Sequence, residues 1–142
     1  MNKVVTVLLI CIPFLSFSQL ETNLLGNWHD ENITPAFFDN PYHDVWGVTL
    51  NGIEYGIISS TDGFHFFDMT TQPIGNEPVA FAEATIQGAQ ISHRDIKIYQ
   101  NYLYAVADEG PSALQIFDMS GLPNSVELVY ESNEFITRTH NI

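Results

Sequence analysis

Three short stretches of the chain carry polar pairs that could bind a metal ion or a polar ligand. In each pair an imidazole or guanidinium side chain precedes a carboxylate or its amide. Imidazole nitrogens and carboxylate oxygens are the protein ligands that zinc and related metals use. The candidate ligand-binding residues are His43, Asp44, His93, Arg94, Asp95, His140 and Asn141.

A structural interpretation of the same pairs stands beside this one. None has the spacing of a helix-borne metal motif such as His-Glu-x-x-His. A carboxylate or amide at the entry of a strand also binds backbone N–H groups of a neighbouring element. In that interpretation Arg94 pairs with one of the acids, and the site is structural rather than functional.

The octet "FFDMTTQP" at 66–73 returns as "IFDMSGLP" at 116–123, with an aspartate at the same place in each. Asp68 and Asp118 could form an ion site that recurs in every repeat. Aspartate followed by serine or threonine is also typical of a turn, in which the carboxylate accepts backbone N–H groups. A residue that recurs in every repeat more often stabilises the fold of the repeat than binds a ligand. We therefore expect Asp68 and Asp118 to stabilise turns.

The elements that must position these residues are β-strands. Short runs rich in valine, isoleucine, tyrosine and phenylalanine alternate with turn residues such as Asn51-Gly52, the strongest short hairpin signal. The expected strands of the first repeat are 44–50, 53–59, 64–69 and 79–85. Those of the second repeat are 95–100, 102–108, 113–119 and 126–132.

Four antiparallel strands in about 50 residues are typical of one blade of a β-propeller. The sequence therefore predicts an all-β fold with two four-stranded antiparallel blades, at 44–92 and 93–138, and the start of a third at 139–142. A propeller closes with ~4–8 blades, so we expect an incomplete propeller. If the first strands are innermost, the candidate ligand-binding residues meet at one mouth of the central channel.

The first residues resemble an export signal. A positive start at Lys3 is followed by an apolar run that is too short to span a bilayer. We predict a signal peptide at 1–18, cleaved after Ser18, and a lead-in segment at 19–43. Cleavage also removes Cys11, the only cysteine. The mature chain is expected to be secreted or at the cell surface, with no transmembrane span.

The composition is strongly acidic. Four basic residues face 17 acidic ones, for a formal net charge of −13. Such a surface repels phosphate backbones and excludes nucleic acid as a partner. It attracts cations, so a divalent cation stays open, although no cofactor is predicted.

Several of these stretches, taken in order, are similar to a known family. The matching pieces are "HDVWG" (43–47), "HRDIKIYQNYLYAVAD" (93–108), "LQIFDMSGLP" (114–123) and "THNI" (139–142). They resemble the LVIVD-repeat propellers, and more specifically the secreted choice-of-anchor B family of bacteria. The resemblance implies an exported, often surface-anchored β-propeller without a well-defined biochemical activity.

Two functions are compatible with this pattern. The first is a non-catalytic module that binds an extracellular protein, a glycan or a surface component. Aromatic residues such as Trp28 and Tyr42 could stack on sugars or fill layers between blades. The second is a metal-assisted hydrolase at the channel mouth, which would use the strand-start histidines and aspartates. The chain has no Gly-x-Ser-x-Gly, Walker or His-Glu-x-x-His motif, which favours the first.

Overall fold

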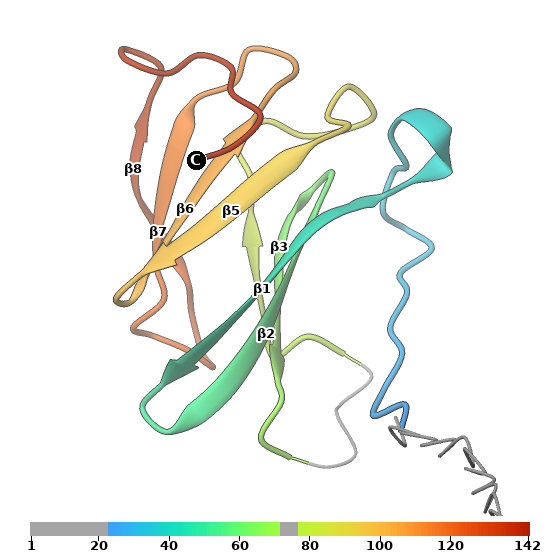
Figure 1. The fold of residues 1–142 in the computed structure, drawn as a ribbon, viewed down its shortest axis with the longest axis vertical. Coiled ribbons are helices and arrows are strands. Elements are labelled where there is room, and N and C mark those ends of the chain that lie inside the picture. Colours follow the sequence, from blue (N-terminus) through green and yellow to red (C-terminus); the bar gives the residue numbers. More distant parts are fainter. Residues whose placement is uncertain (1–22, 72–76) are drawn as a thin grey trace, which may run out of the picture.

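A computed structural model describes residues 23–71 and 77–142. The predicted fold class is confirmed, because these residues form two four-stranded antiparallel sheets (Figure 1). The sheets do not close into a barrel within this part of the chain, as expected for blades of an incomplete propeller. The predicted signal peptide lies outside the described residues.

Each sheet is a meander in which neighbouring strands follow one another in the chain. The first contains β1 (Tyr42–Leu50), β2 (Ile53–Ser60), β3 (Gly63–Asp68) and β4 (Ala80–Glu83). The second contains β5 (Arg94–Tyr99), β6 (Tyr102–Ala107), β7 (Leu114–Asp118) and β8 (Glu127–Ser132). A 3₁₀ turn, η1 (Phe37–Asp39), precedes β1.

The strands lie where the sequence predicted them, with small differences at their ends. β1 begins at Tyr42, two residues earlier than predicted, so His43 lies inside the strand rather than before it. β4 is shorter than predicted. The Asn51-Gly52 hairpin is present, and both residues have positive φ values of 52° and 81°. Two central residues with positive φ are what a tight hairpin turn requires.

The core lies between the two sheets. β5 runs beside β1 and also contacts β2, as the yellow and teal strands of Figure 1 show. Both sheets contribute to the core, and the buried set includes Ile57, Phe64, Phe66, Ile96, Leu103, Phe117 and Met119. Phe64 and Phe117 meet edge to face, with ring centroids 4.9 Å apart.

The lead-in segment covers part of the opposite face of the first sheet. Trp28 packs against His65 and Phe67, with ring centroids 4.7 and 5.1 Å away. The last strand of the second sheet, β8, instead leaves Leu128, Val129 and Tyr130 exposed. No helix of the described residues has the length and apolar character to cross a membrane.

Burial of His65 predicts that acid destabilises the fold. Its Nε2 lies 2.9 Å from Ser60 Oγ, and burial lowers its pKa to about 4, although Asp30 acts in the opposite direction. The His65 imidazole therefore binds a proton near pH 6.5 in the unfolded chain but only near pH 4 in the folded chain. Above about pH 6.5 the contribution of His65 to the free energy of unfolding is constant. Between about pH 6.5 and pH 4 the free energy of unfolding decreases as the pH is lowered.

We expect the free energy of unfolding to fall by up to about 2 kcal/mol across this window from His65, after allowing for solvent screening. Urea denaturation at several pH values measures this loss. In His65→Gln, which keeps a neutral polar group near Ser60, the loss should be smaller. His29→Gln is the control, because His29 is exposed. Equal pH dependence in the wild type and His65→Gln would contradict the prediction.

Candidate functional site

The predicted strand-start residues gather at one end of the two sheets. β1 and β5 run side by side in the same direction (Figure 1), so their first residues lie at the same end. The segment 139–142 reaches this end too, because the Ile142 N–H donates to Asp95 Oδ2 at 2.8 Å. We call this region the strand-start end.

Two of the candidate aspartates join successive repeats. Asp44 Oδ2 accepts the N–H of Ile96 at 3.1 Å, from β1 to β5. One repeat later Asp95 Oδ2 accepts the N–H of Ile142, so the same bond recurs between β5 and the segment 139–142. Both carboxylates are therefore engaged in backbone contacts of the kind that the structural interpretation describes.

Asp95 has a further partner in Lys97, whose Nζ lies 3.3 Å from both carboxylate oxygens. Burial acts to raise the pKa of Asp95. The Ile142 N–H and the Lys97 ammonium favour the charged form and outweigh burial, so the pKa lies below its usual value. The carboxylate is thus a charged acceptor at neutral pH.

Among the described residues Arg94 forms no ion pair with an acid, so the structure does not bear out that part of the structural interpretation. Arg94 as a residue is 2% exposed. Its Nε donates to the Ser60 carbonyl at 3.1 Å and its Nη2 to the Ile86 carbonyl at 2.6 Å. It also lies over the Phe64 ring at 5.5 Å. Burial lowers its pKa to about 10, still far above neutral pH. Arg94 therefore brings a fixed positive charge between the sheets.

Three histidines approach one another at the strand-start end. The rings of His93 and His140 stack at 3.7 Å, with an angle of 12° between their planes. His43 is half-buried, and neither ring nitrogen has a hydrogen-bond partner among the described residues. Burial, with Arg94 and His93 nearby, lowers the pKa of His43 to about 4, so the ring is neutral at physiological pH.

Asp108 belongs to this cluster, and the sequence analysis did not select it. His140 Nδ1 lies 2.6 Å from Asp108 Oδ2. The signal was available in the strand pairing. Arg94, the first residue of β5, pairs with Ala107, the last residue of β6, so the residue that follows β6 lies beside the residue that precedes β5. Asn141, in contrast, is exposed, and its carbonyl accepts a hydrogen bond from Thr139 Oγ1 at 3.1 Å.

The repeated Asp68 and Asp118 lie at the other end of the sheets, in turns. Each Oδ1 accepts the backbone N–H two residues later, from Thr70 and Ser120 respectively, at 2.8 Å. Asp118 Oδ1 also accepts Asn101 Nδ2 at 2.8 Å. These are the local side-chain-to-backbone bonds that stabilise turns.

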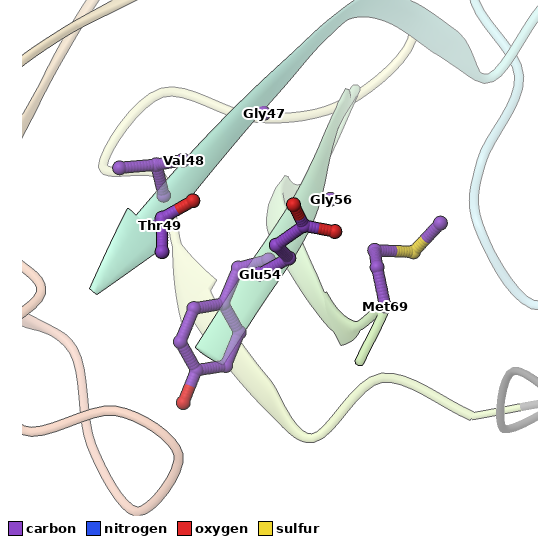
Figure 2. Close-up of a pocket in the computed structure, with 7 residues that line it drawn as sticks. Gly47, Val48, Thr49, Glu54, Gly56 and Met69 are labelled. Atoms are coloured by element: carbon purple, nitrogen blue, oxygen red, sulfur yellow. The ribbon is translucent and has the colours of Figure 1, made fainter. Parts of the chain in front are cut away.

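Two hollows differ in their relation to these residues. One, of about 380 Å³, lies where Gly47 and Gly56 leave room on the sheet, beside Glu54 and Met69 (Figure 2). It lies toward the β1–β2 hairpin and away from the strand-start end. The other, of about 230 Å³, reaches the strand-start end and is lined by Trp28, Tyr42, His43, Asp44, Val45 and Ile58.

The strand-start end thus combines structural carboxylates, a buried guanidinium, a histidine-aspartate cluster and a small aromatic hollow. No family model matches the chain, and neither a curated protein nor a solved structure shows significant similarity to it.

Proposed function

We propose that the protein is an exported β-propeller module, secreted or held at the cell surface, with a non-catalytic binding role. The sequence of 1–18 and the resemblance to LVIVD-repeat propellers support export and the propeller architecture. The engagement of Asp44, Asp95 and Arg94 in backbone contacts between repeats supports a structural role for them. The partner would be an extracellular protein, a glycan or a surface component.

The hollow of about 230 Å³ beside His43 carries this proposal. Ligand pockets usually span about 300–1,000 Å³, so this one suits a single sugar ring or a single side chain. Trp28 and Tyr42 offer aromatic surface, and His43 and Asp44 offer polar groups at its edge. Aromatic faces with a few polar groups are the usual composition of such sites.

One observation favours the second candidate, a metal-assisted hydrolase. His93, Asp108 and His140 form a set of metal-ligating side chains at the same end. Two histidines and a carboxylate also hold the metal in some hydrolytic zinc enzymes. The hydrolase would use this cluster with an added divalent ion, whereas the binding module would not need it.

A blocked-hollow variant tests the binding role. Val45 lines the hollow and is 66% exposed, so Val45→Arg should fill the hollow without disturbing the core. Val129→Arg is the matched control, because Val129 is 52% exposed on the second sheet. The fluorescently labelled full chain is titrated against a glycan array and against intact bacterial cells.

We expect saturable binding that Val45→Arg weakens by roughly tenfold or more and Val129→Arg leaves unchanged. Equal binding by both variants, or none by the wild type, would overturn the proposal. Nitrophenyl esters, phosphates and glycosides are assayed in parallel with added Zn²⁺. Turnover that disappears in His93→Ala would favour the hydrolase.

A further inference from the structure

A cluster of metal-ligating side chains lies where the second sheet meets the segment 139–142. His93 directly precedes β5, Asp108 directly follows β6, and His140 belongs to that segment. One ligand atom from each lies within 4.8 Å of the others. The two imidazoles are already stacked, and His140 already contacts the carboxylate.

Unsatisfied buried atoms in the same cluster point to a missing ligand. Among the described residues, no hydrogen-bond partner is present for His93 Nδ1 or for Asp108 Oδ1, and both atoms are buried. A buried polar atom without a partner destabilises the folded state, because it has lost its hydrogen bonds to water. Most such atoms in native proteins are satisfied by protein, water or an ion. An ion held by this cluster would use both.

The junction between the first and second repeats indicates which charge the junction between the second repeat and the segment 139–142 should carry. Along the repeat, Arg94 takes the position that His140 takes one copy later, since each directly precedes the strand-start Asp95 or Asn141. At the first junction the Arg94 guanidinium brings a buried positive charge that bonds two carbonyls. At the second junction an imidazole replaces it, beside another imidazole and a carboxylate. A bound cation would restore the positive charge there.

We propose that His93, Asp108 and His140 bind one divalent transition-metal ion of the zinc class. Two imidazole nitrogens and one carboxylate oxygen suit Zn²⁺ and its neighbours in the first row. Ca²⁺ and Mg²⁺ prefer sets of six or more oxygen ligands, of which this cluster offers few. Water or a ligand would complete the coordination.

Binding requires a small movement of His140. Metal–ligand bonds of about 2.0–2.2 Å bring ligating atoms to roughly 3.3 Å from one another, closer than the present limit of 4.8 Å. Stacked, nearly parallel rings also aim their lone pairs side by side rather than at one point. The His140 side chain is 64% exposed, so its ring can turn toward the ion.

The ion would fasten the third repeat to the second. His93 and Asp108 belong to the second sheet, and His140 is two residues from Ile142, whose N–H bonds Asp95. The metal would therefore act on the same junction as the Asp95 bond. Such a site stands whether or not the protein binds a surface partner, because it stabilises the module itself.

Metal titration of the full chain tests the proposal. The chain is stripped with EDTA and titrated by calorimetry with Zn²⁺, Ni²⁺, Ca²⁺ and Mg²⁺, and its Co²⁺ complex is examined by visible absorption. The variants are His93→Ala, Asp108→Asn and His140→Ala. His29→Ala is the control, because His29 lies outside the cluster, against Tyr42. Melting in EDTA checks that each variant folds.

We expect one equivalent of Zn²⁺, a tetrahedral or five-coordinate Co²⁺ spectrum, and a higher melting temperature with Zn²⁺ than with EDTA. Each cluster variant should weaken Zn²⁺ binding by roughly 100-fold or more, since even the loss of an outer-sphere partner costs 10–100-fold. His29→Ala should bind as the wild type does.

Three outcomes would overturn the proposal. They are no Zn²⁺ binding, binding that His140→Ala leaves unchanged, and equal affinity for Ca²⁺ or Mg²⁺. The last would show only that the acidic surface attracts cations. Because the exposed His140 side chain can be removed with little effect on the core, failure to fold does not confuse these results.

Discussion

Replacing Phe64 with alanine will lower the free energy of unfolding by about 3–5 kcal/mol. The ring is fully buried between the two sheets, where it meets the edge of Phe117 and lies under the Arg94 guanidinium. Removing it creates a cavity at the contact that joins the repeats. Urea denaturation followed by tryptophan fluorescence measures the change.

Phe38 supplies the matched control, because it is the same residue type and 99% exposed. Phe38→Ala should change stability by no more than about 0.5 kcal/mol. A double-mutant cycle with Phe117→Ala should give a coupling energy of about 0.5–1.5 kcal/mol, as is usual for aromatic pairs. A loss below about 1 kcal/mol in Phe64→Ala would show that the sheets do not pack through this ring.

The second large effect is expected at Arg94. In Arg94→Ala the Ser60 and Ile86 carbonyls lose their donor and a cavity opens above Phe64. Unsatisfied buried acceptors and lost packing together should cost about 3–5 kcal/mol. Arg94→Met keeps most of the volume and avoids a buried charge, so its cost should be lower, by about 1–2 kcal/mol. Denaturation curves of both variants give the two values.

Arg138 is the matched control for this prediction, since it is an exposed arginine outside the core. Arg138→Ala should stay within about 0.5 kcal/mol of the wild type. If Arg94→Ala behaves like Arg138→Ala, the guanidinium does not hold the sheets together. Both variants remove the guanidinium donors, but Arg94→Met keeps most of the side-chain volume. If the two variants are equally unstable, the lost hydrogen bonds to the two carbonyls, and not the lost packing, account for the destabilisation.

The strands were predictable because local patterns decide them. Asn51-Gly52 prefers the positive φ values of a hairpin, and alternation of apolar residues assigns one face of each strand to the core. The turn-stabilising role of Asp68 and Asp118 was also predictable, because each carboxylate accepts a hydrogen bond from the backbone N–H two residues later. Local chemistry of this kind needs no knowledge of the tertiary structure.

The candidate site was less predictable, because it depends on long-range pairing. Asp108 joins His93 and His140 only through the register of β5 with β6 and the return of the segment 139–142. The partner of Arg94 was predicted to be an acid, yet the nearest acceptors are carbonyls at the first sheet's turn and before β5. The packing of Trp28 against His65 could not be predicted from the strand pattern, because Trp28 lies before the first predicted strand.

The most direct test measures amide hydrogen exchange at Ile96 and Ile142 in the wild type, Asp44→Ala and Asp95→Ala. If strand-start carboxylates join successive repeats, both amides are protected in the wild type. Asp44→Ala should then speed exchange at Ile96, and Asp95→Ala at Ile142, by roughly tenfold or more for a lost charge-assisted bond. Rates at both amides that neither substitution changes would contradict the account.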